Sequence, residues 1–452
     1  MDIQVIEELI ESKKLSVAVF GLGRIGLPTA LMYAKGGYHV NGVDINLPLL
    51  EDLKNKKTFI DEPGLPEILE YAVDNGMITF SNDFEAAIAN SDIIVICVPT
   101  PVSESKVPNY TAIIDVAKKI GKYITKNKIV INESSVSPTT IKSLLIPLIE
   151  NESGLQINLD FGVCSCPERA DPGKIVDNWN KVARIVGGSS DEIGKSIVKL
   201  YEKISQAQIY QVSTPGTANA VKLTENIFRD VNIALMNEFA VLYERLGIDV
   251  KEVIGGSSTK YNFQPHYPGP GVGGPCLPAN SYYIIQDAEK VDYIPFLIRV
   301  SREVNDRMPQ NVLDLVTNAL NSVGKCLSDS VVSVLGISYK ANVRDVQISP
   351  AMKVIDYLLM KNAKIQVWDP YYKGEHVGNF QVLNSIEESL LKSDCVVVLT
   401  DHKEFYSLDF ENLHSQTGQP FVIIDSRNIY DPQKLPQGTI YCGVGRKLKK
   451  VE

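Results

Sequence analysis

The most informative segment of this chain runs Ser16-Val-Ala-Val-Phe20, Gly21-Leu-Gly-Arg-Ile-Gly26, Leu27-Pro-Thr-Ala-Leu-Met-Tyr-Ala-Lys35. Its first part is apolar and partly β-branched, as in a buried strand, and its last part has the composition of a helix. A second apolar run, Tyr38-His-Val-Asn-Gly-Val43, follows and ends at Asp44. The order strand, glycine-rich turn, helix, strand predicts the start of a parallel α/β sheet.

The turn Gly21-Leu-Gly23-Arg24-Ile25-Gly26 has the spacing GxGxxG. Glycines at these positions let the backbone and a helix N-terminus approach a pyrophosphate, and an acid at the end of the next strand can accept both ribose hydroxyls. Asp44 would repel a 2′-phosphate, which favours NAD over NADP. The alternative is a turn that only closes helix on strand, with Asp44 an ordinary turn residue. The strand and helix context favours dinucleotide binding.

The last third of the chain repeats the pattern of the first. Three segments have counterparts in the same order: Val331–Gly336 resembles Val17–Gly21, Ile365–Asp369 resembles Val40–Asp44, and Ser393–Leu399 resembles Ser91–Cys97. Continuous apolar strands separated by helix-length segments are typical of parallel, doubly wound sheets. The sequence therefore predicts two related Rossmann-like domains, with sites at the carboxyl ends of their strands.

Between these domains lies a long stretch with helical periodicity, Ala220 to Gly247, which predicts a central helical domain. Its apolar positions extend round more than one face, which suggests burial against another helix or another subunit. The expected domains are residues 1–212, 213–312 and 313–452.

Composition excludes several classes of protein. The 452 residues include 44% hydrophobic and 22% charged residues, close to globular averages, and the net charge is −9, opposite to that expected of a nucleic-acid binder. The seven cysteines form neither a disulfide framework nor a zinc motif, so we expect a reduced, cytoplasmic protein with no metal site. No signal peptide or run of 18 apolar residues is apparent, which argues against export and membrane insertion.

Several side chains are candidates for chemistry. Cys276 lies in a loop rich in Pro and Gly, Tyr267 to Pro278, and could be either a nucleophile or a small buried apolar residue. Lys222 and Asn226 are four residues apart on one helical face, where they could stabilise a substrate oxyanion or could simply be solvated. Glu168 and Ser135 follow expected strands of the first domain, where an α/β site collects its side chains.

A series of longer motifs follows in order along the chain: GLGRIGLP, CVPTP (Cys97–Pro101), NESSVSPTT, CPERADPGK, VKLTENIFR, YPGPGVGGPCLP and SYKANVRDVQISPA. Together these motifs resemble the UDP-glucose/GDP-mannose dehydrogenase family over nearly the whole chain. The resemblance implies an NAD-binding domain, a central helical domain that dimerises and carries the Cys276 loop, and a C-terminal UDP-sugar-binding domain. It also implies oxidation of a sugar C6 alcohol to a carboxylate.

The family pattern implies roles for individual residues. Cys276 matches the nucleophile that forms a thiohemiacetal and then a thioester, and Lys222, aided by Asn226, matches the residue that stabilises the oxyanions. The implied catalytic set is Cys276, Lys222, Asn226, Glu168, Ser135 and Asn280. The implied cofactor set is Gly21, Gly23, Arg24, Ile25, Gly26, Asp44, Pro99, Thr100 and Ser135. The implied substrate set is Glu168, Arg169, Lys222, Asn226, Tyr267, Gly271, Gly273, Lys340 and Arg344.

The sequence departs from the family pattern at three places. Asn280 stands where the family commonly has Asp, and an amide can orient a water but cannot take its proton, which leaves Glu168 as the base. Pro275 precedes the cysteine where the acetamido-sugar branch often has His. Gln347 occupies a position that is often Arg, and Arg344 is the candidate to replace it.

The segment Thr259–Gly274 resembles the UDP-N-acetylhexosamine 6-dehydrogenases more than the UDP-glucose enzymes, so the expected substrate is UDP-N-acetylglucosamine or UDP-N-acetylmannosamine. UDP-glucose is the alternative substrate. A 3-hydroxyacid or 6-phosphogluconate type of dehydrogenase would leave the third domain and the Cys276 loop unexplained. Asn280 and Gln347 leave a catalytically silent nucleotide-sugar binder as a further alternative, but the joint presence of Cys276, Lys222, Asn226 and Glu168 argues against it.

Overall fold

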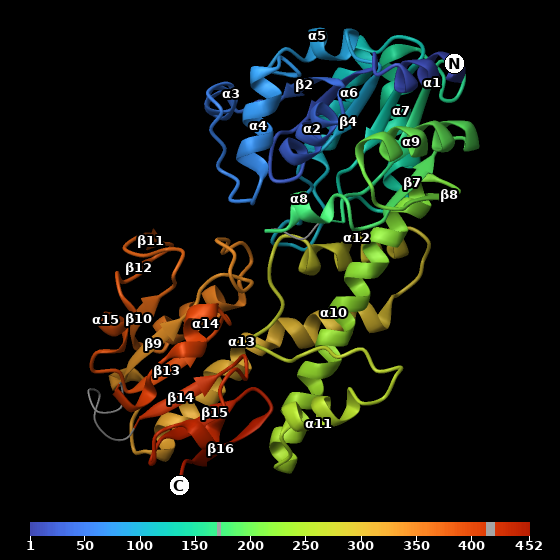
Figure 1. Ribbon diagram of the computed structural model, residues 1–452. Helices are drawn as coiled ribbons and strands as arrows, with labels where there is room; N and C mark the ends of the chain where they lie inside the picture. The colour runs from blue at the N-terminus through green and yellow to red at the C-terminus, as the bar shows by residue number, and fades with distance from the viewer. Residues whose placement is uncertain (170–172, 413–420) are drawn as a thin grey trace. The chain divides into compact units, whose positions relative to one another are not determined.

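The computed structural model describes residues 1–169, 173–412 and 421–452 of the chain (Figure 1). It divides into two compact units, one formed by Met1–Glu225 and Tyr282–Ile294 and the other by Asn226–Ser281 and Pro295–Glu452. Each unit contains a mainly parallel sheet, and the segment between the sheets is helical. The predicted class of two Rossmann-like domains joined by a helical region is confirmed.

The first unit has an eight-stranded sheet in the order β3-β2-β1-β4-β5-β6-β7-β8. Its strands are β1 Ser16–Phe20, β2 His39–Val43, β3 Ile78–Ser81, β4 Ile93–Ile96, β5 Lys128–Asn132, β6 Phe161–Ser165, β7 Arg184–Gly188 and β8 Ile209–Val212. All neighbours are parallel except β6 and β7. In register, Phe20 at the end of β1 pairs with both Val43 and Ile96, so the carboxyl ends of the three central strands meet at one edge.

Both faces of this sheet are covered. Its helices are α1 Ile3–Glu11, α2 Gly26–Lys35, α3 Leu47–Lys54, α4 Leu65–Asp74, α5 Phe84–Ala89, α6 Thr111–Tyr123, η1 Ile141–Leu145, α7 Ile146–Ser153, α8 Ile175–Asn178 and α9 Asp191–Ile204. Val17 and Val19 belong to a core with α1, α2, α4 and α9. Ala18 and Phe20 belong to the opposite core with α5, α6 and α7. The two-residue alternation of a strand explains why a continuous apolar run was needed here.

The second unit has a six-stranded sheet in the order β10-β9-β13-β14-β15-β16, in which only β16 is antiparallel to its neighbour. Its strands are β9 Val331–Leu335, β10 Lys364–Trp368, β13 Cys395–Val398, β14 Val422–Asp425, β15 Ile440–Gly443 and β16 Arg446–Lys450, with a separate hairpin of β11 His376–Val377 and β12 Phe380–Gln381. The helices that lie wholly in this unit are α11 Val250–Ser257, α13 Phe296–Ser322, η2 Leu327–Asp329, α14 Pro350–Met360, α15 Ile386–Leu390, η3 Lys403–Ser407 and η4 Pro432–Lys434. Two further helices, α10 Pro215–Leu246 and α12 Leu277–Glu289, contribute residues to both units.

The predicted internal repeat extends to backbone geometry. Gly21 and Gly336, which follow β1 and β9, have φ angles of +89° and +86°. Each donates its N–H to the last residue of the neighbouring strand, Gly21 to the carbonyl of Val43 at 2.8 Å and Gly336 to that of Trp368 at 2.9 Å. A positive φ favours glycine, so both copies keep glycine at the point where the chain leaves the first strand.

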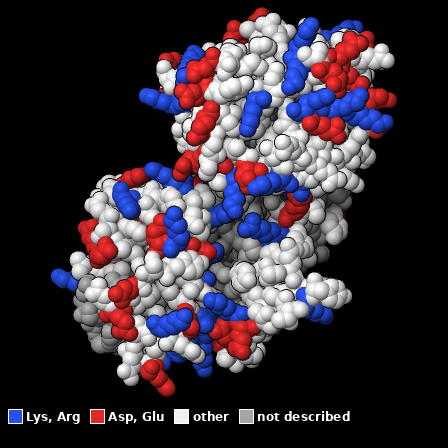
Figure 2. Space-filling model, in the orientation of Figure 1, with Lys and Arg blue, Asp and Glu red and all other residues white. Residues whose placement is uncertain are grey.

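The surface of each unit carries interspersed acidic and basic side chains on the face shown in Figure 2. Among the helices of the described residues, none combines the length and the apolar character that a membrane span requires. The longest helix, α10, ends where the sequence predicts, before Gly247, which has a φ of +73°.

We predict that Gly26→Ala destabilises the first unit, because a Cβ at this position would lie 1.7 Å from the Gly21 carbonyl oxygen. The free energy of unfolding in urea should fall by about 3 kcal/mol or more. The control is Gly23→Ala, whose Cβ would meet no atom within 4 Å and should leave stability nearly unchanged. Equal stability of the two variants would contradict the close approach of this turn to its helix.

Candidate functional site

The glycine turn after β1 forms an open cradle at the amino end of α2. Added side chains at Gly21 and Gly26 would collide with backbone oxygens, at 2.7 Å from Cys97 and 1.7 Å from Gly21, whereas the space over Gly23 is empty to 4 Å. Arg24 is exposed, and Ile25 is the residue before the first turn of the helix. The turn therefore presents bare backbone and a helix N-terminus to a ligand.

Asp44 follows β2 and is half-buried beside this cradle. Its carboxylate accepts hydrogen bonds from the Leu22 N–H at 2.7 Å and from the Asn46 N–H at 2.9 Å. These bonds hold the carboxylate against the glycine turn, which is the position that a ribose-binding acid needs.

Two loops follow the next strands of the same edge. Pro99 and Thr100 come after β4, and Ser135 comes after β5. The Thr100 hydroxyl donates to the Ser135 carbonyl at 2.7 Å, and the Tyr283 hydroxyl donates to the Thr100 carbonyl. The structure thus joins two of these predicted cofactor residues, Thr100 and Ser135, by a bond from side chain to backbone, while the Ser135 side chain is half-buried.

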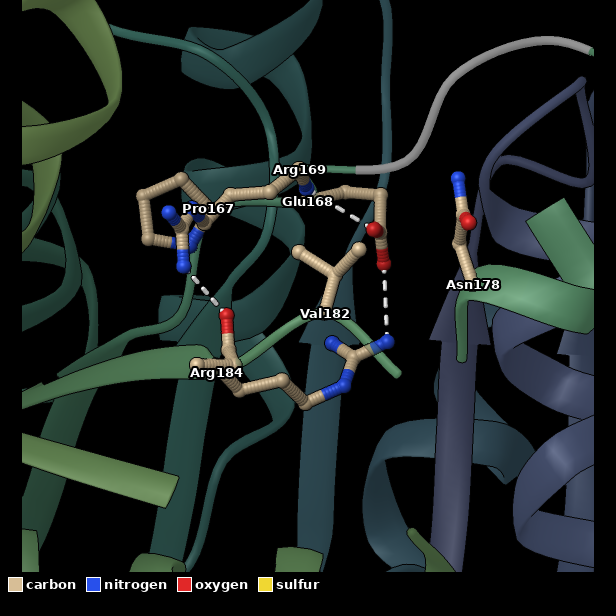
Figure 3. Close-up of a pocket in the computed structure, with 7 residues that line it drawn as sticks. Pro167, Glu168, Arg169, Asn178, Val182 and Arg184 are labelled. Carbon is tan, nitrogen blue, oxygen red and sulfur yellow. Dashed lines mark hydrogen bonds and ion pairs between the residues drawn. The ribbon is translucent and has the colours of Figure 1, made fainter. Parts of the chain in front are cut away.

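Glu168 follows β6 and accepts hydrogen bonds from Arg184 and Arg169. Its carboxylate accepts from the Arg184 guanidinium at 2.9 Å and from the Arg169 N–H at 2.8 Å, and its side chain is 11% exposed. Figure 3 shows the carboxylate between these two groups, beside a cavity of about 10 Å³ lined also by Asn178 and Val182. Such a volume is about enough for one water molecule.

The Arg169 side chain, which the sequence suggests as a substrate contact, is engaged within the protein. Its guanidinium donates to the Glu225 carboxylate of α10, at 3.0 Å from Nε, and to the Ala183 carbonyl. A substrate would have to compete with this ion pair.

Sequence reasoning missed Arg184 and Glu133, which form a buried charged cluster with Glu168. Arg184 also contacts the Glu133 carboxylate at 3.9 Å and stacks on the Trp179 ring at 3.6 Å. Glu133 is fully buried and accepts from the hydroxyls of Thr29 at 2.8 Å and Tyr201 at 2.6 Å. An arginine at the start of an apolar strand and a glutamate directly after another were the available signals, because buried charges in proteins are paired.

The electrostatics of this cluster follow from its burial. Burial raises the pKa of Glu133, and Glu168 adds to that effect, although Arg184 opposes it. Burial by itself disfavours the charge on Arg184, but Glu168, Cys166 and Glu133 outweigh it, and the pKa of Arg184 lies well above its ordinary value. Arg184 is therefore a permanent cation between two carboxylates.

The central helix α10 carries Lys222 and Asn226 as predicted, four residues apart. Lys222 is half-buried, and no hydrogen bond or ion pair to its ammonium occurs within the described ranges. The Asn226 amide donates at 2.6 Å to the amide oxygen of Asn280, which is 2% exposed. The structure brings these two predicted site residues together.

Cys276 is exposed and directly precedes α12, whose first turn it begins by accepting the Asn280 N–H at 3.0 Å. The loop before it packs against the segment after β9. Side chains at Gly273 and Gly274 would collide with Pro350 and with the Tyr339 ring. A Cβ added at Gly271, where φ is +128°, would lie only 3.1 Å from the Asn305 carbonyl oxygen. The absence of side chains at these glycines therefore lets the backbone of the cysteine loop pack closely against Tyr339, Pro350 and Asn305.

Lys340 and Arg344 follow β9 in the second unit. Lys340 is half-buried. Arg344 is exposed, and its Nη2 donates to both carboxylate oxygens of Glu375, at 2.7 and 3.0 Å. Both residues lie in the segment that follows β9, and the Arg344 guanidinium already has an internal partner.

A larger cavity in the second unit is lined by Tyr267, which the sequence analysis selects, and by residues that it did not select. It has a volume of about 270 Å³ and is lined by Val250, Lys251, Ile254, Tyr267, Pro268, Asp401, Tyr406, Arg427, Asn428 and Ile429. Arg427 and Asp401 form an ion pair at 2.9 Å in its wall. Their positions after β14 and β13 were the signal, because α/β sites form at the carboxyl ends of strands.

Three sequence models of one family match this chain in order. They are the NAD binding domain of the UDP-glucose/GDP-mannose dehydrogenase family over residues 15–205, the central domain over residues 216–307 and the UDP binding domain over residues 333–432.

Individual proteins match over nearly their full length. A UDP-N-acetyl-D-mannosamine dehydrogenase of Pyrococcus horikoshii is 35% identical over 96% of this chain and 99% of its own. A UDP-N-acetyl-D-glucosamine 6-dehydrogenase of Pseudomonas aeruginosa is 30% identical over 93% of this chain and 99% of its own. A solved structure of UDP-D-ManNAc dehydrogenase from Pyrococcus horikoshii superposes with a TM-score of 0.89 at 34% identity, covering 96% of this chain and 99% of that one.

We predict that Arg184→Met lowers the free energy of unfolding by about 3–5 kcal/mol, because it leaves two buried carboxylates without their shared cation. The measurement is denaturant unfolding of the purified variant. Lys195→Met is the control, since Lys195 and Asp191 form an exposed pair, 63% and 65% accessible, and its loss should have little effect. A stability loss no larger than that of the control would contradict a structural role for the Arg184 cluster.

Proposed function

Because this chain belongs to the UDP-glucose/GDP-mannose dehydrogenase family, we propose that it oxidises the C6 hydroxyl of a UDP-N-acetylhexosamine to the carboxylate. It is an NAD-dependent nucleotide-sugar dehydrogenase, an oxidoreductase. The observation that carries the choice of substrate is near full-length similarity, at 30–35% identity, to proteins named for UDP-N-acetyl-D-mannosamine and UDP-N-acetyl-D-glucosamine. The turnover experiment below decides between the two epimers at C2, UDP-N-acetylmannosamine and UDP-N-acetylglucosamine.

The residues of the first unit fit NAD. The empty space over Gly23 admits a pyrophosphate against the backbone, and Asp44 is held where ribose hydroxyls could donate to it. We assign the cofactor to Gly21, Gly23, Arg24, Ile25, Gly26, Asp44, Pro99, Thr100 and Ser135. When bound, NAD supplies a hydride acceptor, which the conversion of an alcohol to an acid requires twice per sugar.

Cys276 is the nucleophile in this proposal. After the alcohol has lost a proton and a hydride, the sulfur adds to the aldehyde carbon and forms a thiohemiacetal. Loss of the second hydride leaves a thioester, and water breaks its C–S bond, releasing the carboxylate and restoring the thiol. The position of Cys276 at the amino end of α12 supports this role, because the partial positive charge there favours a thiolate.

Other side chains manage charge and protons. Lys222 stabilises the oxyanions formed at C6, and its charge is available because its ammonium has no hydrogen-bond or ion-pair partner among the described residues. Asn226 donates a hydrogen bond to Asn280. Because Asn280 is an amide, it orients the water but does not take its proton. Glu168 is the base for hydrolysis, since a carboxylate can take the proton of water and an amide cannot. Ser135 helps to hold a water or the C6 oxygen.

We propose that Lys340, Arg344, Tyr267, Gly271 and Gly273 contact the UDP moiety and that Glu168, Arg169, Lys222 and Asn226 contact the sugar. The corresponding domains are residues 1–212 for NAD, 213–312 for the helical region with the cysteine loop, and 313–452 for UDP.

We propose that the chain forms a homodimer through α10. Along this helix Phe228, Leu235 and Leu242 recur every seven residues and are 51%, 44% and 47% exposed. Large apolar side chains at heptad spacing on an exposed helix face are typical of helix pairing. We also propose a cytoplasmic location, consistent with the cysteine content.

The first test is turnover with NAD and, separately, UDP-N-acetylmannosamine, UDP-N-acetylglucosamine and UDP-glucose, counting NADH formed per sugar consumed. We expect two NADH per sugar with one of the acetamido sugars. One NADH per sugar would instead support a simple alcohol dehydrogenase, and UDP binding without any turnover would support a silent binder.

We predict that Cys276→Ser lowers uronate formation by about a thousandfold or more, because the weaker oxygen nucleophile cannot form the thioester. The assay is uronate release from the preferred substrate. Cys326→Ser, also an exposed cysteine of the second unit, is the control and should retain activity. Normal uronate production by the Cys276 variant would rule out the covalent mechanism.

We predict that Leu235→Asp together with Leu242→Asp gives a monomer, because the charges would be buried in the α10 interface. Light scattering during gel filtration measures the mass. Leu391→Asp, at a side chain that is 51% exposed elsewhere, is the control and should remain a dimer. A monomeric wild-type protein, or a dimeric double variant, would contradict this interface.

A further inference from the structure

Asp369 in the second unit is the structural counterpart of Asp44 in the first. Asp44 accepts the N–H groups of Leu22 and Asn46, and Asp369 accepts those of Ile337, at 2.8 Å, and Tyr371, at 2.9 Å. In both copies the donors are the residue after the strand-ending glycine and the second residue after the aspartate. The repeat has therefore kept the bridge between the first and second strands.

The environments of the two aspartates differ. Asp44 is half-buried, whereas Asp369 has no exposed surface and lies 3.1 Å from Nε2 of His402, which is also fully buried. Burial alone raises the pKa of Asp369, but its hydrogen bonds from His402 and from backbone N–H groups outweigh this and keep its pKa below the ordinary value. His402 thus covers the carboxylate of Asp369, whereas that of Asp44 stays half-buried.

The second ring nitrogen of His402 holds a loop. Nδ1 accepts the Asn342 N–H at 3.0 Å, so this nitrogen carries no proton, and Nε2 donates to Asp369. Asn342 has a φ of +58°, and its side-chain oxygen accepts the Lys403 N–H at 3.1 Å. The loop after β9 and the loop after β13 are therefore joined in both directions.

A further bond reinforces the same junction. The Thr400 hydroxyl donates to the Ser338 carbonyl at 2.6 Å. Strands β9 and β13 are neighbours, with β10 on the far side of β9, so the order of the sheet reverses between them. Ligands of open α/β sheets bind at such a reversal, beyond the carboxyl ends of the strands. The loop held by His402 also carries Lys340 and Arg344 on either side of Asn342.

We propose that His402 is a positioning residue for nucleotide binding, fixing the Lys340–Arg344 loop against the reversal point so that Lys340 can reach the UDP moiety. This inference rests on the proposed function, which assigns the UDP moiety to that loop. His402 has no exposed surface, so it acts through Asn342 rather than by touching the ligand. By covering Asp369, it also turns the duplicated ribose-binding position into a structural support.

The test is titration of the full-length protein with UDP alone, comparing His402→Ala, His402→Asn and His402→Gln with wild type. The Asn oxygen can replace Nδ1 as the acceptor for the Asn342 N–H, whereas the Gln amide can replace only the donor to Asp369. We expect the dissociation constant for UDP to rise about tenfold in the Ala and Gln variants and to recover largely in the Asn variant. His39→Ala, at an exposed histidine of the first unit, is the control.

Further readouts separate positioning from general stability. The dissociation constant for NAD should stay unchanged in all variants, and in turnover KM for the nucleotide sugar should rise while kcat stays within about twofold. Wild-type UDP affinity in His402→Ala, or equal losses of UDP affinity in the Asn and Gln variants, would overturn the positioning role of His402 and leave the proposed function standing. Failure of the wild-type protein to bind UDP would overturn the proposed function as well.

Discussion

The hydrogen bond between an aspartate at the end of the second strand and the backbone N–H after the strand-ending glycine organises each sheet. In the first unit it joins Asp44 to Leu22 at 2.7 Å, and in the second it joins Asp369 to Ile337 at 2.8 Å. The positive φ of the glycine turns the next N–H away from the strand ladder, and a buried N–H without an acceptor would cost about 1–3 kcal/mol. The carboxylate satisfies it and aligns the edge from which the site loops leave.

The two copies use this bridge in different ways. In the first unit the carboxylate stays half-buried beside an open glycine turn, which suits a dinucleotide. In the second unit Ser338 and Ala341 stand in the places of the two later glycines, and His402 covers the carboxylate. One fold therefore supplies a cofactor cradle and, in our proposal, a platform for the UDP moiety. The two units differ in what lies against the aspartate: His402 covers Asp369, whereas Asp44 stays half-buried beside the glycine turn.

A second constraint, in the first unit, is that buried carboxylates must be paired with the buried cation Arg184. Arg184 lies between Glu168, which faces a small cavity, and Glu133, which is fully buried and bonded to Thr29 of α2. The cofactor helix and the proposed base are thus connected through one buried cation. Because a carboxylate can be buried only with compensating donors, the geometry of Glu168 is inseparable from this cluster.

The sequence by itself determined the strand–turn–helix start, the duplication and the helical middle, because periodicity and glycine positions report burial and backbone conformation within one element. It also indicated Asp44, Lys222 and Cys276 through their positions after strands, on a helix and in a glycine loop. Only the tertiary structure decided which polar groups pair: Arg184 with Glu133 and Glu168, Arg169 with Glu225, Asn226 with Asn280, and His402 with Asp369. Partners such as Asn226 and Asn280 are far apart in the chain. Their pairing depends on strand order, helix packing and loop path, which no local pattern of residues records.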